Sequence, residues 1–252
     1  MKPRILQIAI LHFVMLLSIC LSQDFSTLLE IADEREEGND FQGNYKALKE
    51  AERLDPENGK VLWRLARAHF DLSDNTGDEG SVEENVYAGF DYAKKALEKA
   101  PNSAKAHKWY GILTGRVGEI EGTEQKIKNS YEVAEHTLRA IELDLEDDGN
   151  YHVMGRWHYS LADLNWFERT VASIVYTRPP EASFEEARDY FLKAIEKAPE
   201  EIRHRLWLGK TLFELDDEDD AAETLKQALA IKPESESDRL LQQEARKLLN
   251  DL

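Results

Sequence analysis

Residues 206–233 read LWLGKTLFELDDEDDAAETLKQALAIKP, and this stretch decides the fold. Within it, Ala221, Leu225, Ala228 and Pro233 follow one another at steps of four, three and five. The steps of four and three place three side chains on one face of a helix, and the proline ends that helix. The apolar residues before this helix, with Leu208-Gly209 among them, predict a first helix that packs against the second.

The same steps recur earlier in the chain. Ala187, Phe191, Ala194 and Pro199 repeat them, and the two closing prolines are 34 residues apart. A helix–turn–helix period of 34 residues is the signature of the tetratricopeptide repeat. Such units stack so that neighbours bury a shared apolar core. The repeat therefore predicts a stack of helical hairpins.

Three weaker copies keep this register. They are Asn44, Leu48, Ala51 and Pro56; Gly89, Ala93, Ala96 and Pro101; and Val133, Thr137, Ala140 and Leu145. The sequence thus predicts an all-α fold, a tetratricopeptide-like α–α superhelix of about five helical hairpins plus a C-terminal capping helix. The predicted repeat domain covers residues 23–252, with units at 25–58, 60–101, 104–146, 148–200 and 202–235 and the capping helix at 236–250. Ser235, with Asp238 three residues on, is the expected N-cap of that last helix.

A small residue is expected where the two helices of a unit cross. Gly111, Gly155 and Gly209 each follow a large apolar or aromatic residue at the same repeat position. Glycine destabilises a helix interior by roughly 1 kcal/mol, so three at one position indicate a close approach of helices. Arg67 occupies this position in the second unit and departs from the pattern.

The middle units are longer than 34 residues. In the third unit, the sequence predicts longer helices on either side of a break at Gly122. In the fourth, residues 165–181 are inserted, and an apolar helical stripe runs up to Pro179-Pro180. That stripe either packs on neighbouring units as additional core or forms an exposed docking surface. The predicted docking residues are Trp166, Phe167, Val171 and Ile174.

Residues 1–22 form a separate segment. Lys2 and Arg4 precede an apolar run from Ile5 to Leu21, and small residues stand just before Gln23. This pattern is typical of a cleaved signal peptide, and the alternative is an uncleaved signal anchor. Both predict a secretory or membrane-anchored location. The chain's one cysteine, Cys20, lies in this segment, so the repeat domain is predicted without disulfides or zinc–cysteine sites.

Composition and motifs narrow the function. Fifty acidic and 32 basic residues give a formal charge of −18, which disfavours nucleic acid as a partner because its phosphates would be repelled. No phosphate-binding glycine loop, nucleophile elbow or His-Glu-x-x-His pair is present in the sequence. We therefore expect that the protein is not an enzyme and that it binds no cofactor and no metal.

One constellation stands out against this acidic background. The repeat register projects six cations onto the inner, concave face of the first helices: Arg64, Lys105, Lys108, Arg156, Arg203 and Lys210. A basic groove bordered by acids would draw an anionic group into it. The expected ligands are an acidic peptide, a peptide carboxylate or a lipid phosphate. The alternative is that these cations pair with neighbouring acids such as Glu201 or Glu214.

Three motifs carry a narrower resemblance: Lys108-Trp-Tyr-Gly111, Gly155-Arg-Trp-His-Tyr159, and the insertion with Trp166-Phe-Glu-Arg169 and Pro179-Pro180. Together they resemble the regulator of microtubule dynamics protein family, over roughly residues 63–249. The resemblance implies association with microtubules and spindle poles, or with mitochondrial and endoplasmic-reticulum membranes, where some members act as tethers or lipid binders.

The sequence as a whole predicts a non-enzymatic interaction scaffold that binds an anionic peptide or lipid headgroup in the basic groove. The resemblance adds microtubules as a partner and the cytoplasm or cytoskeleton as a location. Two alternatives stay open: a membrane-anchored tether or lipid-binding protein, and a secreted or luminal protein-binding module unrelated to microtubules.

Overall fold

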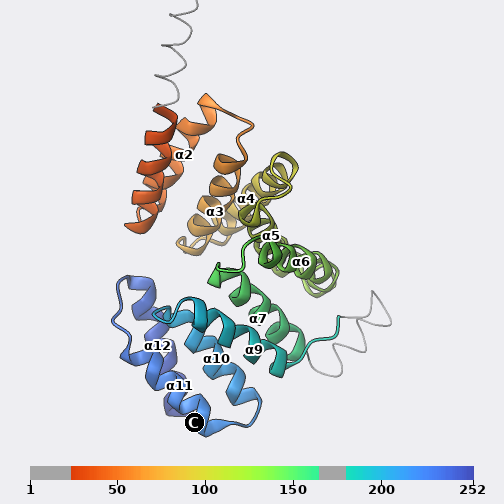
Figure 1. Cartoon of the computed structure of the whole chain (residues 1–252), viewed down its shortest axis with the longest axis vertical. Helices are drawn as coiled ribbons and strands as arrows, with labels where there is room; N and C mark the ends of the chain where they lie inside the picture. Colours follow the sequence, from red (N-terminus) through yellow and green to blue (C-terminus); the bar gives the residue numbers. More distant parts are fainter. Residues whose placement is uncertain (1–23, 165–179) are drawn as a thin grey trace, which may run out of the picture. The chain divides into compact units, whose positions relative to one another are not determined.

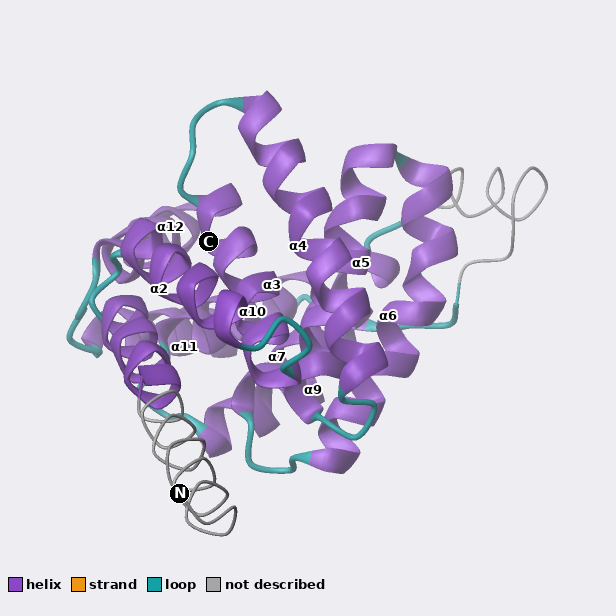
Figure 2. Cartoon of the chain, turned by 90° about the horizontal axis from the view of Figure 1, so that it is seen from above, coloured by secondary structure: helices purple, strands orange, loops and turns teal. Residues whose placement is uncertain are grey.

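A computed structural model of the 252-residue chain describes residues 24–164 and 180–252. The predicted N-terminal segment and the docking residues Trp166, Phe167, Val171 and Ile174 lie outside the described residues. The part described consists of helices joined by loops and turns (Figure 2). No helix within these two ranges is both long and apolar enough to cross a membrane.

The described chain divides into two compact units, one up to Ala100 and one from Pro101 onward. The first unit holds a helix over residues 24–37, α2 (Phe41–Leu54), α3 (Gly59–Asp74) and α4 (Glu79–Lys99). The second holds α5 (Ala104–Glu121), α6 (Thr123–Leu143), α7 (Asp148–Ala162), α9 (Phe184–Lys197), α10 (Ile202–Glu214), α11 (Glu218–Ala230) and α12 (Glu236–Asp251). The predicted all-α tetratricopeptide-like fold is confirmed.

Within each unit, consecutive helices pack as hairpins (Figure 1). In the first unit α3 packs on α4, and α2 packs on α3. In the second, the principal pairs are α5 with α6, α7 with α9, and α10 with α11, while α12 packs on α10 and α11. The predicted break is confirmed, because Gly122 has a φ of +94° and separates α5 from α6.

Short polar side chains start most of these helices. The N-cap side chains that accept a hydrogen bond from a backbone N–H of the first turn are Asp40, Asn58, Asp78, Ser103, Asp147, Ser183 and Ser235. Such a bond satisfies an N–H that has no partner inside the helix. Ser235 and Asp238 form a complete capping box, which confirms the predicted start of α12.

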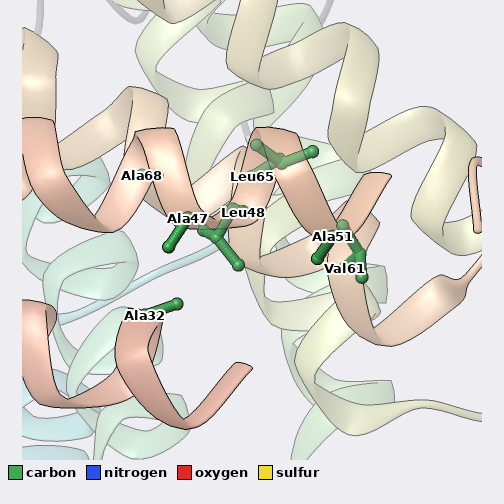
Figure 3. Close-up of a cluster of buried hydrophobic side chains, with 7 residues drawn as sticks. All are labelled: Ala32, Ala47, Leu48, Ala51, Val61, Leu65 and Ala68. Atoms are coloured by element: carbon green, nitrogen blue, oxygen red, sulfur yellow. The ribbon is translucent and has the colours of Figure 1, made fainter. Parts of the chain in front are cut away.

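The motif residues supply the core of each unit. In the first unit, a buried cluster of small and large apolar residues joins the helix over 24–37 to α2 and α3: Ala32, Ala47, Leu48, Ala51, Val61, Leu65 and Ala68 (Figure 3). In the second, Phe191 and Leu225 are fully buried together with the alanines on either side of them in the motif. The 4-3-5 spacing therefore marks the face of the second helix that packs inward.

Candidate functional site

The six predicted cations lie on α3, α5, α7 and α10. Arg64 is on α3 in the first unit, and the other five are on α5, α7 and α10 in the second. Arg64 thus belongs to a different unit from the other five cations, and a single face that includes all six stays a prediction. Arg64 donates through Nε and Nη2 to the carboxylate of Asp33 at 3.0 and 3.1 Å, and its guanidinium lies 4.3 Å from the centre of the Trp63 ring.

Asp147 joins two of the predicted lysines. Lys105 Nζ lies 2.7 Å from Asp147 Oδ2, and Lys108 Nζ lies 2.8 Å from Oδ1. Asp147 is also the N-cap of α7 and accepts the backbone N–H of Gly149 at 3.0 Å. The side chains of Lys108 and Asp147 are only 15% and 6% exposed. This carboxylate therefore ties α5 to the start of α7 in a largely buried ion pair.

The pKa shifts of this pair follow from burial and charge. Burial lowers the pKa of Lys108, and the Asp147 carboxylate opposes this shift without cancelling it. Burial by itself would raise the pKa of Asp147, but the charge of Lys108 and the hydrogen bonds from both lysines hold the pKa below its usual value. A side chain at residue 149 would collide with the ammonium of Lys108, so glycine there leaves room for the lysine.

A chain of hydrogen bonds runs from Asp148 into the core. Asp148 Oδ2 accepts from Nε2 of His204 at 2.9 Å and from Arg203 at 3.2 Å. Nδ1 of His204 lies 3.0 Å from Nδ1 of His152, so one ring donates to the other. Burial lowers the pKa of His152 well below its usual value, so this imidazole is neutral. The arrangement links α7 to α10.

Two cations share one indole ring. The Arg156 guanidinium of α7 lies 4.5 Å from the centre of the Trp207 ring, and the Lys210 ammonium lies 4.4 Å from it. Trp207 also packs edge-on against Tyr159 and stacks with Phe191. Arg156 is exposed, and Lys210 pairs with Glu244 of α12. We call Arg156, Trp207 and Lys210 the indole site.

Most of the predicted cations contact a carboxylate. Arg203 pairs with Glu201 at 3.1 Å, which is one of the ion pairs expected under the alternative. Glu214, the other acid named there, accepts a 3.5 Å hydrogen bond from Tyr159. The acids that sequence reasoning missed are Asp33, Asp147, Asp148 and Glu244. The N-cap preference of aspartate before α7 was a usable signal for Asp147. No sequence signal pointed to the contact between His152 and His204, because these residues are 52 positions apart in the chain.

A polar depression lies in the first unit. It has a volume of about 440 Å³, and its polar lining includes Asn39, Gln42, Asn75, Thr76, Ser81 and Asn85. Several of these groups are already satisfied, since Asn85 donates to the Ser81 carbonyl and accepts from His69. No cluster of three metal-ligating side chains occurs in the described ranges.

Two solved structures share this fold over nearly their whole length. A thermophilic TPR protein of Thermus thermophilus matches 88% of this chain and 99% of its own, with a TM-score of 0.66 and 13% identity. PilF of Pseudomonas aeruginosa matches 92% of this chain and 86% of its own, with a TM-score of 0.58 and 13% identity. At this identity the likeness shows the fold alone.

Sequence comparison is more specific. Regulator of microtubule dynamics protein 1 of Mus musculus is 42% identical over 200 residues, which cover 78% of this chain and 65% of the mouse protein. The Bos taurus protein 1 is 38% identical, with 90% of this chain and 71% of the relative covered. Protein 3 of Mus musculus is 31% identical, and the match spans 90% of this chain but 49% of that relative.

The chain thus spans about two thirds of the length of the mouse protein 1 and about half of the mouse protein 3. The family model described as regulator of microtubule dynamics protein 1-3 matches residues 28–252, which is nearly all of the repeat domain. This chain therefore belongs to the regulator of microtubule dynamics protein 1–3 family.

Proposed function

We propose that the chain is a non-enzymatic interaction scaffold and that the indole site captures an acidic peptide segment of a partner. The observation that carries the proposal is the placement of Arg156 and Lys210, from two different helices, against the single ring of Trp207. The indole packs against both cations, and each can donate charge-assisted hydrogen bonds to carboxylates.

The energetics favour the indole site over the two lysines of α5. A ligand carboxylate at Lys108 would have to displace Asp147, and breaking such a buried pair costs about 3–5 kcal/mol. At Lys210, whose side chain is 21% exposed, the competitor is Glu244, whose side chain is 51% exposed, against 6% for Asp147. A surface pair of this kind contributes about 0–1 kcal/mol, so a ligand can replace it at little cost. The proposal therefore concerns two of the six predicted cations, Arg156 and Lys210.

The partner that we propose is the acidic surface of a microtubule. The relatives are named for the regulation of microtubule dynamics. A chain with a formal charge of −18 would be repelled by an acidic surface except where cations are exposed. We therefore expect microtubule binding to depend on the indole site and to weaken as salt screens the charges.

The direct test uses a fluorescein-labelled, glutamate-rich peptide and the full chain. Fluorescence anisotropy should show saturable binding that the double substitution Arg156→Gln and Lys210→Gln weakens about tenfold, the equivalent of about 1.4 kcal/mol. The matched control is Lys193→Gln together with Lys226→Gln, because these are exposed lysines on α9 and α11 and their loss changes the charge equally. The proposal fails if the double variant and the control bind the peptide equally.

The same variants separate the possible sources of the acidic group. In co-sedimentation with microtubules at low and moderate salt, the control should pellet with the microtubules, whereas the double variant should stay in the supernatant. Flotation with phosphatidylcholine vesicles, with and without phosphatidylserine, tests the alternative of a lipid phosphate. Vesicle binding that the double variant loses, without any loss of microtubule binding, would contradict the microtubule proposal.

A further inference from the structure

Helix α6 carries a second apolar face in addition to the face that packs inward. Its inward residues are Val133, Thr137 and Ala140, and all three are buried. A separate line of apolar residues, which we call the outer seam, consists of Tyr131, Ala134, Leu138 and Ile141. Tyr131 and Leu138 are 48% and 42% exposed, while Ala134 and Ile141 are half-buried.

The spacing of the outer seam is that of a coiled-coil interface. Its four residues alternate at steps of three and four, the a and d positions of a heptad, along a helix of 21 residues. Leu145, just beyond the end of α6, is 58% exposed and extends the apolar surface at this end. A helix of this length is about 30 Å long, enough for several turns of a partner helix.

The last repeat folds without an apolar face at these positions. In the repeat register, Tyr131 and Leu138 correspond to Asp219 and Lys226 of α11. Both α11 residues are exposed and charged, and α11 still packs its buried face on α10. Apolar residues at these positions are therefore not a requirement of the repeat. Leu192 of α9, the equivalent of Leu138, is 48% exposed but has Glu185 at the position of Tyr131.

Acidic residues border the outer seam. Glu135 and Glu142 occupy the heptad positions that flank a coiled-coil interface, and both are exposed. Glu132 and Glu146 lie close by and are also exposed. Two bases also reach this border: Arg139 pairs with Glu142 at 2.9 Å, and Lys197 of α9 pairs with Glu146 at 2.8 Å. The border is therefore predominantly negative, which favours a partner that carries lysine or arginine beside its apolar residues.

We infer that the outer seam binds a basic amphipathic helix of a partner protein, through knobs-into-holes packing along α6 and salt bridges to Glu135 and Glu142. The inference is independent of the indole site, because it concerns a different helix and a ligand of opposite charge. A second copy of this chain fits less well, because two α6 helices would bring their acidic borders together. An anionic membrane is disfavoured for the same electrostatic reason.

The test uses a synthetic helix as the probe, with the full chain. The peptide has about three heptads, leucine at a and d, and lysine at e and g. Its binding is measured by fluorescence anisotropy. Because a basic peptide is attracted to any acidic protein, the decisive variants leave the charge unchanged. Leu138→Ser should weaken binding about tenfold. The matched control, Leu192→Ser on α9, removes an equally exposed leucine and should leave the affinity unchanged.

A second pair of variants tests the acidic border. Glu135→Gln together with Glu142→Gln should weaken binding about tenfold, whereas Glu196→Gln on α9, another exposed glutamate, should have a much smaller effect. Helix content and the urea midpoint of each variant verify that the fold is retained. Equal loss in Leu138→Ser and Leu192→Ser would overturn the proposal, as would equal binding of a peptide with glutamate at e and g. Dimerisation of the wild-type chain that Leu138→Ser abolishes would assign the seam to a second copy instead.

Discussion

Gly155 in α7 lies directly against the ring of Phe191 in α9, so that a Cβ on residue 155 would come within 2.6 Å of a ring atom. The same relationship joins Gly209 to Leu225, at 2.7 Å, and Gly111 to Thr137, at 3.0 Å. In each case the glycine of the first helix faces the second residue of the 4-3-5 motif. The close approach of the two helices is thus made by a matched pair of positions in each of these three repeats.

Gly155→Ala should destabilise the chain. Overpacking of a filled core costs about 1–3 kcal/mol, which exceeds the roughly 1 kcal/mol that alanine gains over glycine in a helix. Gly115→Ala is the control, because its Cβ would lie 3.7 Å from Val133, at ordinary contact distance. That variant should be stabilised by about 0.5–1 kcal/mol. Urea unfolding measures both, and equal midpoints for the two variants would contradict the packing argument.

Arg67 explains why the second repeat departs from this pairing. Its side chain stands where the last three repeats have glycine, and the second motif residue of this repeat is the small Ala93. Arg67 pairs with Glu36 and lies 3.5 Å from Asp71. Burial raises the pKa of Asp71 to about 7, against the opposing charge of Arg67. The charged side chain of Arg67 at the crossing position is thus accompanied by two half-buried carboxyl groups, those of Glu36 and Asp71.

Asp71→Asn should change how stability depends on pH. The pKa of Asp71 in the folded chain, about 7, lies above its usual value of 3.8, so the native state holds a proton that the unfolded chain has released. The wild type should therefore lose stability relative to Asp71→Asn as pH rises from about 4 to about 7, by up to about 1.4 kcal/mol per pH unit. Asp91→Asn, an exposed aspartate of α4, is the control. A stability difference that stays constant over this range would contradict the raised pKa.

Asp147→Asn should destabilise the second unit, because it leaves the largely buried Lys108 without its counter-charge. Loss of one partner from such a pair costs about 3–5 kcal/mol. Asparagine still caps α7, so the loss reports the charge and not the cap. Asp147→Ala removes both and should cost about 0.5–2 kcal/mol more. Thermal unfolding checks this order, and pairing Asp147→Asn with Lys108→Met should recover part of the loss.

The pH dependence of this pair has the opposite sign. The pKa of Asp147 in the folded chain is lowered, so its contribution to stability is complete above its usual pKa. That contribution is lost as pH falls through the lowered value. Asp147→Asn should therefore approach the stability of the wild type in strong acid. A deficit that persists unchanged to the lowest pH would argue that geometry, and not charge, is what the substitution removes.

The helices and their contacts were predictable because each depends on residues close together in the sequence. The motif residues such as Phe191 and Leu225 are apolar at helical spacing, and the glycines mark where helices cross. Caps such as Ser235 are equally local. The fold could therefore be predicted from one chain without knowledge of its relatives.

The state of the six cations could not be predicted in the same way. Asp147 and Asp148 stand in an acidic stretch that the sequence alone favours as solvated, yet their positions at the start of α7 place them beside Lys108 and His204. Glu244 reaches Lys210 from the capping helix, 34 residues away. Each pairing depends on how consecutive hairpins pack, which periodicity within one helix does not specify.

Binding of acidic peptides at the indole site is tested most directly by NMR. The tryptophan indole N–H signals are followed during titration with a glutamate-rich peptide. Trp207→Phe assigns the signal of Trp207. Trp157, whose indole donates to the Ser130 carbonyl at 2.7 Å, is the internal reference. We expect a saturable shift of the Trp207 signal, with an affinity that falls as salt rises, while the Trp157 signal stays unchanged. Peptide binding that leaves the Trp207 signal unshifted would contradict binding at the indole site.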